Sequence, residues 1–124
     1  MRRISISDGR TVLYAVLNDT VAARDFARRL PCRMTGTDSG TDYCFPAASG
    51  IYDPMETRVG WENGDLCLCG GYFAILYGGA EGSGSCSDMV LIGRLEAPSL
   101  KQIEKWPDRV TVKVAPVSSG ESEV

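Results

Sequence analysis

Short segments of alternating apolar and polar residues, bounded by glycine, proline or aspartate, make up most of this 124-residue sequence. The alternation is clear in residues 3–7 and 11–17, which flank the hairpin-type turn Asp8-Gly9. From residue 32 to residue 115 strand and turn patterns dominate. Short strands joined by tight turns are typical of antiparallel sheets, so the sequence predicts a mainly β barrel or sandwich.

Two segments depart from this pattern and predict helices. Residues 18–20 are three candidate caps for an amphipathic helix that ends before Pro31. Ser99 and Gln102 have capping-box spacing, which predicts a second, short helix up to residues 106–107. We therefore expect one amphipathic and one short helix on the surface of the sheet.

Four further segments predict how the sheet is covered. Residues 66–69 and 72–77 are apolar on both faces, which is typical of central strands with the core on one side and a covering element on the other. Residues 46–60 form the longest irregular segment, and irregular segments of this length are often functional. Residues 78–87, rich in glycine and serine, predict a flexible loop, with a lid over a pocket as the alternative.

The composition favours one globular domain. Hydrophobic residues make up 44% of the chain and its formal net charge is −3, which argues against disorder. We predict a single domain over residues 1–117 and a polar, disordered tail over residues 118–124. No apolar run is long enough to span a bilayer and no signal peptide is recognised, so we expect a cytoplasmic protein without membrane contact.

Charge is unevenly distributed along the chain. Residues 1–34 contain seven basic and three acidic residues, whereas the rest of the chain is acidic. A basic N-terminal third is compatible with nucleic-acid binding, because phosphate neutralisation dominates such affinity. Few aromatic residues lie among these arginines and the chain as a whole is acidic, so we favour a solvated helix surface and predict no nucleic-acid partner.

The absence of histidine excludes every mechanism that needs an imidazole. The serines consequently lack an activating base, and no catalytic residue is predicted. Five cysteines without a secretion signal favour reduced thiols in a core, with metal or redox use as the alternative. Cys67 and Cys69 share one face of a strand but lack the spacing of a zinc knuckle. We predict no metal and no cofactor.

Acidic pairs occur in or beside turns, where carboxylates are usually solvated and unsuited to acid–base catalysis. These pairs are Asp38/Asp42, Glu62/Asp65 and Glu81/Asp88. We expect Asp65 to accept a hydrogen bond from its own turn. The glycine-rich segment lacks the lysine of a phosphate-binding loop, so it predicts no nucleotide site.

Several short motifs, in this order, resemble those of small bacterial cyclophilin-like proteins of unknown function. They are Asp8-Gly9, Leu17-Asn18-Asp19, the helix from Thr20 to Phe26, Leu30-Pro31, Gly64-Asp65-Leu66, Phe73 to Tyr77 and Leu91 to Leu95. The resemblance spans about residues 3–116. It implies a closed eight-stranded cyclophilin-like β-barrel with its helices on the surface.

The resemblance raises the question of prolyl isomerase activity. Cyclophilins of that activity carry a Phe-x-Arg segment on a barrel strand and a histidine in the proline pocket. Here Phe26-Ala27-Arg28 falls in the predicted helix, and the pocket histidine is missing. We therefore expect an uncharacterised barrel that binds a small molecule or short peptide without catalysis, with an atypical prolyl isomerase as the alternative.

Four aromatic residues and two arginines are the candidate ligand-binding residues. Tyr43 and Phe45 share one strand face, Phe73 and Tyr77 share another, and both pairs are compatible with barrel core or with a ligand wall. A groove is expected where Tyr43 and Phe45 meet the 50–58 segment and the glycine-rich loop, with charge supplied by two arginines, Arg58 and Arg94. A third hypothesis is a homo-oligomer that buries the apolar strands between subunits.

Overall fold

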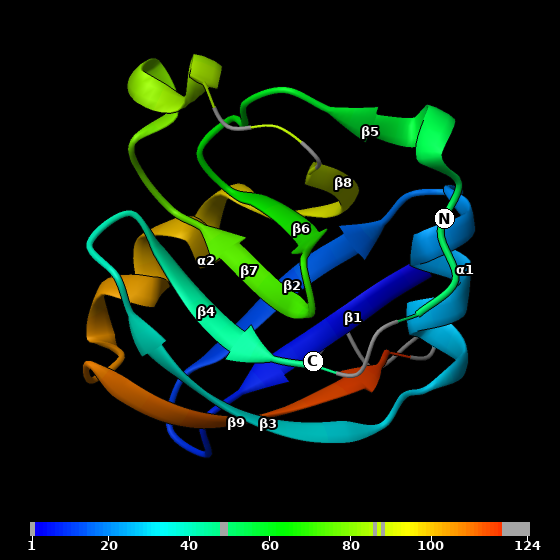
Figure 1. Ribbon diagram of the computed structural model, residues 1–124. Helices are drawn as coiled ribbons and strands as arrows, with labels where there is room; N and C mark the ends of the chain where they lie inside the picture. The colour runs from blue at the N-terminus through cyan, green and yellow to red at the C-terminus, as the bar shows by residue number, and fades with distance from the viewer. Residues whose placement is uncertain (1, 48–49, 86, 88, 118–124) are drawn as a thin grey trace.

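The computed structural model describes residues 2–47, 50–85, 87 and 89–117, and Figure 1 shows its arrangement of strands and helices. The predicted tail over residues 118–124, Cys86 and Asp88 lie outside the described residues. The strands of the described part are β1 (Arg2–Ser7), β2 (Val12–Leu17), β3 (Cys32–Asp38), β4 (Asp42–Pro46), β5 (Thr57–Arg58), β6 (Asp65–Cys69), β7 (Tyr72–Leu76), β8 (Met89–Leu95) and β9 (Arg109–Pro116). Two α-helices, α1 (Val21–Arg28) and α2 (Ala97–Gln102), and three 3-10 turns, η1 (Pro54–Glu56), η2 (Ala80–Ser85) and η3 (Ile103–Lys105), complete it.

Eight strands form a closed antiparallel barrel. Their order is β2-β1-β9-β3-β4-β7-β6-β8, and pairing of β2 with β8 closes the ring. This confirms the predicted eight-stranded barrel. The last strand was expected to close the sheet, but β9 lies between β1 and β3. Closure falls to β2 and β8 because the backbone of β8 passes very close to β2: a Cβ at Gly93 would lie 2.5 Å from the Val16 carbonyl oxygen.

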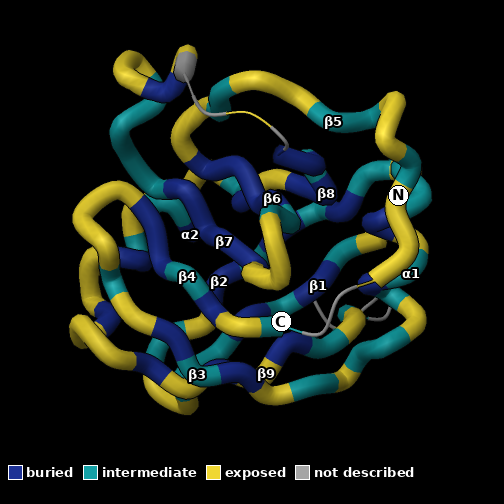
Figure 2. The backbone as a smooth tube through the Cα atoms, viewed as in Figure 1, coloured by how far each residue is buried: buried dark blue, intermediate teal, exposed yellow. Residues whose placement is uncertain are grey.

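The barrel interior contains the hydrophobic core, and Figure 2 shows the buried segments concentrated along the strands. Alternate residues of each strand point inward, as in β1, where Ile4 and Ile6 are buried. Helix α1 covers one end of the interior, where the Phe26 ring stacks on Phe73 with their centroids 5.0 Å apart. The helix therefore completes the core as well as lying on the surface.

Both helices occur where the sequence predicts them, with different ends. Helix α1 starts after Thr20, whose hydroxyl accepts a hydrogen bond from the Ala23 amide, and ends at Arg28, before the predicted limit. Helix α2 starts at Ala97, so the predicted cap Ser99 lies inside it. The buried Ser99 hydroxyl instead accepts a hydrogen bond from the Tyr14 amide on β2, which fastens the helix to the barrel.

The outer face of β6 and β7 carries a second apolar cluster, formed by Cys67, Ala74, Leu76 and Met89, with Trp61 and Leu91 packed against it. Trp61 is held in place because its amide donates to the Ser83 hydroxyl and its indole nitrogen donates to the Gly78 carbonyl. The prediction of a covering element is confirmed for this end of the two strands, whereas Tyr72 at the other end of β7 is half exposed. The glycine-rich segment, expected to be a loop, includes the 3-10 turn η2, which helps to hold that cover.

The segment expected to be irregular between residues 46 and 60 contains two regular pieces. The 3-10 turn η1 is capped by the Asp53 carboxylate, which accepts from the Met55 amide. Strand β5 follows and pairs with the start of β8, opposite Val90 and Met89. The segment is therefore attached to the barrel at its far end, and this attachment positions one wall of the site described next.

Candidate functional site

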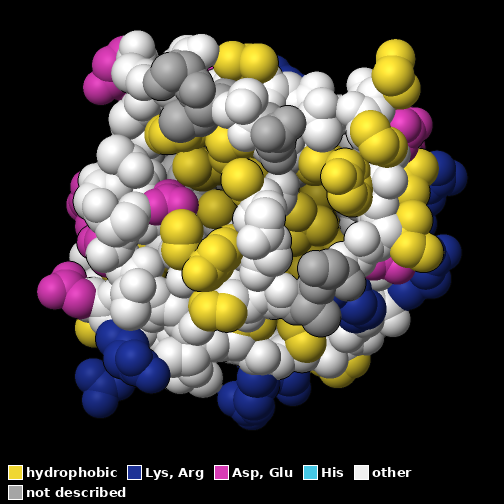
Figure 3. All heavy atoms as spheres, viewed as in Figure 1, with side chains coloured by type: hydrophobic (Ala, Val, Ile, Leu, Met, Phe, Trp, Pro, Cys, Tyr) yellow, Lys and Arg dark blue, Asp and Glu magenta, His cyan; other side chains and the backbone are white. Residues whose placement is uncertain are grey.

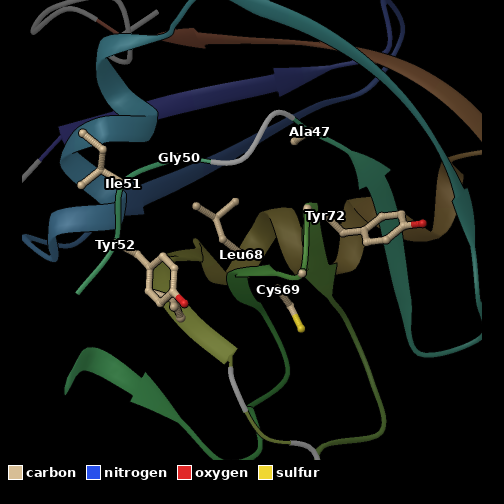
Figure 4. Close-up of a pocket in the computed structure, with 10 residues that line it drawn as sticks. Ala47, Gly50, Ile51, Tyr52, Leu68, Cys69 and Tyr72 are labelled. Carbon is tan, nitrogen blue, oxygen red and sulfur yellow. The ribbon is translucent and has the colours of Figure 1, made fainter. Parts of the chain in front are cut away.

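An apolar hollow of about 370 Å³ lies between the β6–β7 turn and the segment of residues 50–52, which is bonded to α1. Leu68 and Val90, paired across β6 and β8, contribute apolar surface to it. The other lining residues belong to the segment after β4 and to the turn between β6 and β7: Ala47, Gly50, Ile51, Tyr52, Cys69, Gly70, Gly71 and Tyr72. Figure 4 shows these segments around the hollow. A concave apolar site at a barrel mouth is a common location for ligands.

A glycine pair forms one rim of the hollow. Gly70 and Gly71 connect β6 to β7 and both have positive φ, 54° and 87°, as a tight two-residue hairpin requires. A Cβ added at either position would meet no atom within 4 Å, so the space beside the turn is open. The turn is also tied to the opposite rim, because the Ala47 amide donates to the Gly71 carbonyl.

The opposite wall, residues 50–52, is fastened to α1. The Asp25 carboxylate accepts a hydrogen bond from the Ile51 amide and forms ion pairs with Arg28 and Arg29 of the same helical surface. A Cβ at Gly50 would lie 2.4 Å from the Asp25 carboxylate, so glycine allows this close approach. Farther along, the Glu56 carboxylate accepts from the Val21 amide at the start of α1. The wall is thus anchored along its length.

Exposed apolar side chains border the hollow. Ile51 is 61% exposed and Tyr52 53% exposed, and Tyr72 on the β7 side is half exposed. Met55 and Val59, farther along the same segment, are more exposed still. Figure 3 shows hydrophobic side chains gathered at the centre of this face, on both sides of the β6–β7 turn. Contiguous exposed apolar surface of this kind commonly marks a binding site.

Three thiols lie along the neighbouring outer strand faces. Burial raises the pKa of Cys67 to about 12, and the carboxylate of Asp65 acts in the same direction. Burial and a hydrogen bond to the Asp42 carboxylate likewise raise the pKa of Cys44 to about 12. Both are therefore protonated and unreactive near neutral pH. The third, Cys69, is half-buried and lines the hollow.

Comparison with known proteins identifies the family. A model described as "Cyclophilin-like family" matches residues 6–115, which is most of the chain. The chain belongs to the cyclophilin-like family. The fold is also similar to the solution structure of a hypothetical protein from Archaeoglobus fulgidus, with a TM-score of 0.69 and 18% identity over 94% of this chain and 95% of the other. Among curated proteins none matches the sequence.

In this cyclophilin-like barrel the four aromatic candidate residues lie in or beside the core. Phe45 and Phe73 are fully buried, with ring centroids 5.9 Å apart, and the cross-strand neighbour of Phe73 on β6 is Leu68, which lines the hollow. Tyr43 is also buried, and its hydroxyl donates to the carbonyls of Trp106 and Pro107. These three residues support the hollow from beneath or from a distance and do not line it.

The fourth aromatic candidate, Tyr77, lies beyond the end of β7. Its ring centroid is 5.8 Å from that of Tyr43, and its hydroxyl donates to the Asp38 carboxylate. Burial is the main cause that raises the pKa of Tyr77, and this hydrogen bond raises it further. The hydroxyl therefore stays protonated. Tyr77 belongs to the other end of the hairpin from the Gly70-Gly71 turn.

The two candidate arginines are separated in the structure. Arg58 lies exposed on β5. Arg94 lies on β8, where its guanidinium forms ion pairs with Asp65 at 2.9 Å and Glu62 at 2.8 Å. The six sequence-predicted residues therefore do not surround one opening. Of the predicted site segments, 50–58 contributes to the hollow, whereas the glycine-rich loop lies over Trp61.

One expectation about the acidic pairs is wrong. Asp65 was expected to be solvated, but it is only 1% exposed. Its carboxylate accepts the predicted hydrogen bond from its own turn, from the Glu62 amide, and also receives the Arg94 guanidinium. Asp42 is likewise buried and accepts from the Ser39 hydroxyl. The distant Arg94 compensates the burial of Asp65, which a local turn pattern does not reveal, whereas Asp42 is compensated by its chain neighbours Ser39 and Cys44.

The Phe-x-Arg letters lie in α1, as the sequence indicates. The side chain of Phe26 is in the core and Arg28 faces solvent beside Asp25, so the pair does not present a groove residue on a barrel strand. Within the described residues no group of three or more cysteines and acidic side chains is arranged to hold a metal ion. None of the described helices has the length and apolar character needed to cross a membrane.

Sequence reasoning missed most of the residues that line the hollow. Ile51 and Tyr52 were expected at the groove only as part of the 50–58 segment, and Tyr72 was assigned only to a strand, because the exposure of each side chain depends on what other segments cover. One local signal was available: Gly70-Gly71 predicts a tight turn, and residues beside such a turn at a barrel end are poorly covered. That signal identifies the rim of the site but not its floor.

Proposed function

We propose that this cyclophilin-like protein is a binding module that holds a small apolar molecule or an apolar side chain of a short peptide in the hollow at the barrel mouth. The observation that carries the proposal is a concave apolar space of about 370 Å³ bordered by exposed Ile51, Tyr52 and Tyr72. Apolar ligands gain affinity in such a space by removing this surface from water. The anchored walls favour binding because little order is lost when the ligand enters.

Nile red, an uncharged apolar dye, is a suitable probe for the first test. Its fluorescence is titrated against the full chain, the I51E variant and the V12E variant. Val12 is a matched control, because it is also an exposed apolar residue, 40% exposed on β2, and does not line the hollow. We expect I51E to weaken binding about tenfold or more, because it places a charge at an apolar contact, while V12E binds as the unmodified chain does. Equal affinities for both variants would contradict the proposal.

Cysteine protection gives an independent readout at the same site. Cys69 lines the hollow, whereas Cys32, which is also half-buried, does not. Iodoacetamide labelling followed by peptide mass spectrometry measures each thiol separately. Saturating Nile red should slow the labelling of Cys69 and leave Cys32 unchanged. If Cys69 is labelled at the same rate with and without the dye, the ligand binds elsewhere.

Two alternative functions, prolyl isomerisation and self-association, are tested on the same protein. Catalysed exchange of a proline peptide in an NMR exchange measurement, abolished in R58A or R94A, would favour an atypical prolyl isomerase over a binding module. Light scattering over a range of concentrations tests whether a second copy covers the apolar surface around Ile51 and Tyr52. A dimer that I51E dissociates and V12E does not would assign this surface to self-association.

A further inference from the structure

A second hollow lies next to the first and shares a residue with it. It has a volume of about 350 Å³ and is lined by Thr35, Gly36, Thr37, Cys44, Pro46, Tyr72 and Arg109. Tyr72 lines both hollows, so the two are adjacent across β7. Figure 4 shows the Tyr72 ring directed from the β6–β7 turn toward β4. We refer to the two hollows together as the groove, which the Tyr72 ring divides.

The second hollow exists because β3 and β4 separate. These strands pair only at Thr37 and Asp38 within the described residues, opposite Cys44 and Tyr43. Toward Gly36 the contact is too close for any larger residue, since a Cβ there would lie 2.3 Å from the Cys44 carbonyl oxygen. Beyond that contact the strands diverge, and the space between them is open to the surface beside Pro46 and Tyr72.

The chemistry of the second hollow differs from that of the first. It contains the Thr35 and Thr37 side chains and the exposed guanidinium of Arg109, which in the described part of the chain has no carboxylate within ion-pair distance. The nearest acidic residue along the chain is Asp108, and Asp38, which follows the cross-strand partner of Arg109 on β3, already accepts from Tyr77. A carboxylate placed beside Arg109 would receive a charge-assisted hydrogen bond.

The surrounding sheet surface has the same character. The outward residues of β3 and β9 are threonines, basic residues and Ala115, and none of them is acidic: Arg33, Thr35, Thr37, Arg109, Thr111, Lys113 and Ala115. Arg33 and Lys113 are direct cross-strand partners, an arrangement of like charges that disfavours the folded sheet. Figure 3 shows basic side chains along the lower edge, where β3 and β9 lie. In a chain with net charge −3, this surface favours an anionic partner.

From these observations we infer that the occupant of the joined groove is a short extended peptide of a partner protein, with an apolar residue in the first hollow and a carboxylate against Arg109 in the second. This inference rests on the proposed function and specifies its ligand. Three interstrand steps of about 4.8 Å separate β7, at the border of the first hollow, from β9, which carries Arg109, so the ligand spans roughly 14 Å, about four residues of extended chain. A small apolar molecule fills the first hollow but does not reach Arg109.

The test uses amidated heptapeptides labelled with an uncharged dye, with leucine at the second position and glutamate, glutamine or lysine at the sixth. Fluorescence anisotropy measures their binding to the full chain at low salt. We expect the glutamate peptide to bind about fivefold or more tightly than the glutamine peptide, and the lysine peptide to bind most weakly. The preference should shrink in concentrated salt, because the Arg109 contact is exposed to solvent.

The matched pair of variants is R109E and K113E, which change the same charge on the same face of β9. R109E should reverse the preference, so that the lysine peptide binds better than the glutamate peptide, while K113E alters affinity by less than about twofold. Equal effects of the two variants, or equal binding of the glutamate and glutamine peptides, would overturn the inference.

A leucine-to-serine peptide separates this inference from the proposed function. If that change weakens binding while glutamate and glutamine peptides bind equally, the apolar site stands and the peptide inference fails. If leucine and serine peptides bind equally and Nile red binding is insensitive to I51E, both fail. If neither peptide binds although Nile red does, the occupant is a small molecule and the peptide inference is wrong.

Discussion

The two ends of the β6–β7 hairpin are both apolar, but they differ in how far their outward side chains are buried. At one end Cys67, Ala74 and Leu76 are buried beneath Trp61. At the other end Cys69 is half-buried and Tyr72 is exposed, beside the Gly70-Gly71 turn. Both ends are apolar, so composition does not explain the difference. What differs is the cover, and the uncovered end is the one that borders the groove.

The cover at the closed end is built from several separate contacts. Asp65 holds the turn that follows Trp61 and is itself paired with Arg94, while Ser83 and Gly78 hold Trp61 directly. At the open end the wall of residues 50–52 is fastened to α1 through Asp25, which keeps it beside the hairpin without filling the space. The hollow is thus a product of where the wall is anchored.

The largest expected loss of stability comes from comparing a substitution inside the barrel with one on its open outer face. Phe73 and Tyr72 are consecutive residues on β7, the first fully buried and the second half exposed. F73A should lower the free energy of unfolding by about 3–5 kcal/mol, because it leaves a cavity in the aromatic core. Y72A should cost less than about 1 kcal/mol, as surface substitutions usually do.

Urea denaturation measures both variants, and peptide binding is measured on Y72A. Y72A should bind the leucine–glutamate peptide more weakly although it is folded, because it removes the ring shared by both hollows. A Y72A protein that is as destabilised as F73A would show that Tyr72 belongs to the core and would remove the distinction between the two faces.

The W61A substitution should have a smaller effect on stability and should open the closed end of the hairpin. W61A removes the half-buried side chain that lies over Cys67 and should lower stability by about 1–3 kcal/mol, less than for a fully buried tryptophan. Iodoacetamide labelling should then become faster at Cys67, because less burial lowers its raised pKa and opens access. Labelling of Cys67 at an unchanged rate would show that Trp61 is not its cover.

The smallest expected effect concerns an ion pair distant from both ends. Arg3 donates to the Glu96 carboxylate at 2.7 and 2.8 Å, and this hydrogen bonding lowers the pKa of Glu96 below the usual glutamate value. Because the folded-state pKa is depressed, the stabilisation is present above the unfolded-state pKa of about 4.3 and is lost as the pH falls through the folded-state pKa.

E96Q removes this titration. Since both side chains are about one-third exposed, solvent screening limits the loss at neutral pH to about 1 kcal/mol or less. The difference in urea midpoint between E96Q and the unmodified chain should be present at about pH 7 and vanish at about pH 2. A difference that persists unchanged at low pH would assign the effect to packing and not to charge.

Local pattern was sufficient for much of the fold. The alternation around Asp8-Gly9 predicted the first hairpin, the cap at Thr20 predicted α1, and the doubly apolar segments predicted that β6 and β7 have a core face and a covered face. The family resemblance added the closed eight-stranded barrel. These features depend on residues close together in the chain or on their order, so the sequence contains them directly.

The candidate site depended on contacts between distant residues. Asp65 was expected in solvent because it lies at a turn, but Arg94, distant in the chain, pairs with it in the interior. Phe45 and Phe73 each lie on a strand face whose pattern does not show whether it borders core or ligand, and α1 decides this by placing Phe26 against Phe73, which in turn contacts Phe45. The residues that share a strand face are set by the local sequence, whereas the face that is buried depends on how the whole barrel is assembled.

The sequence by itself therefore determined the periodicity of the strands, the positions of the turns and the exclusion of imidazole chemistry. The tertiary structure decided that β2 and β8 close the barrel, which end of the hairpin is covered, and that Tyr72 and Arg109 line the same hollow. The physical reason is that period and turn chemistry act over a few residues, while a hollow is the space left between segments whose positions are set by long-range pairing.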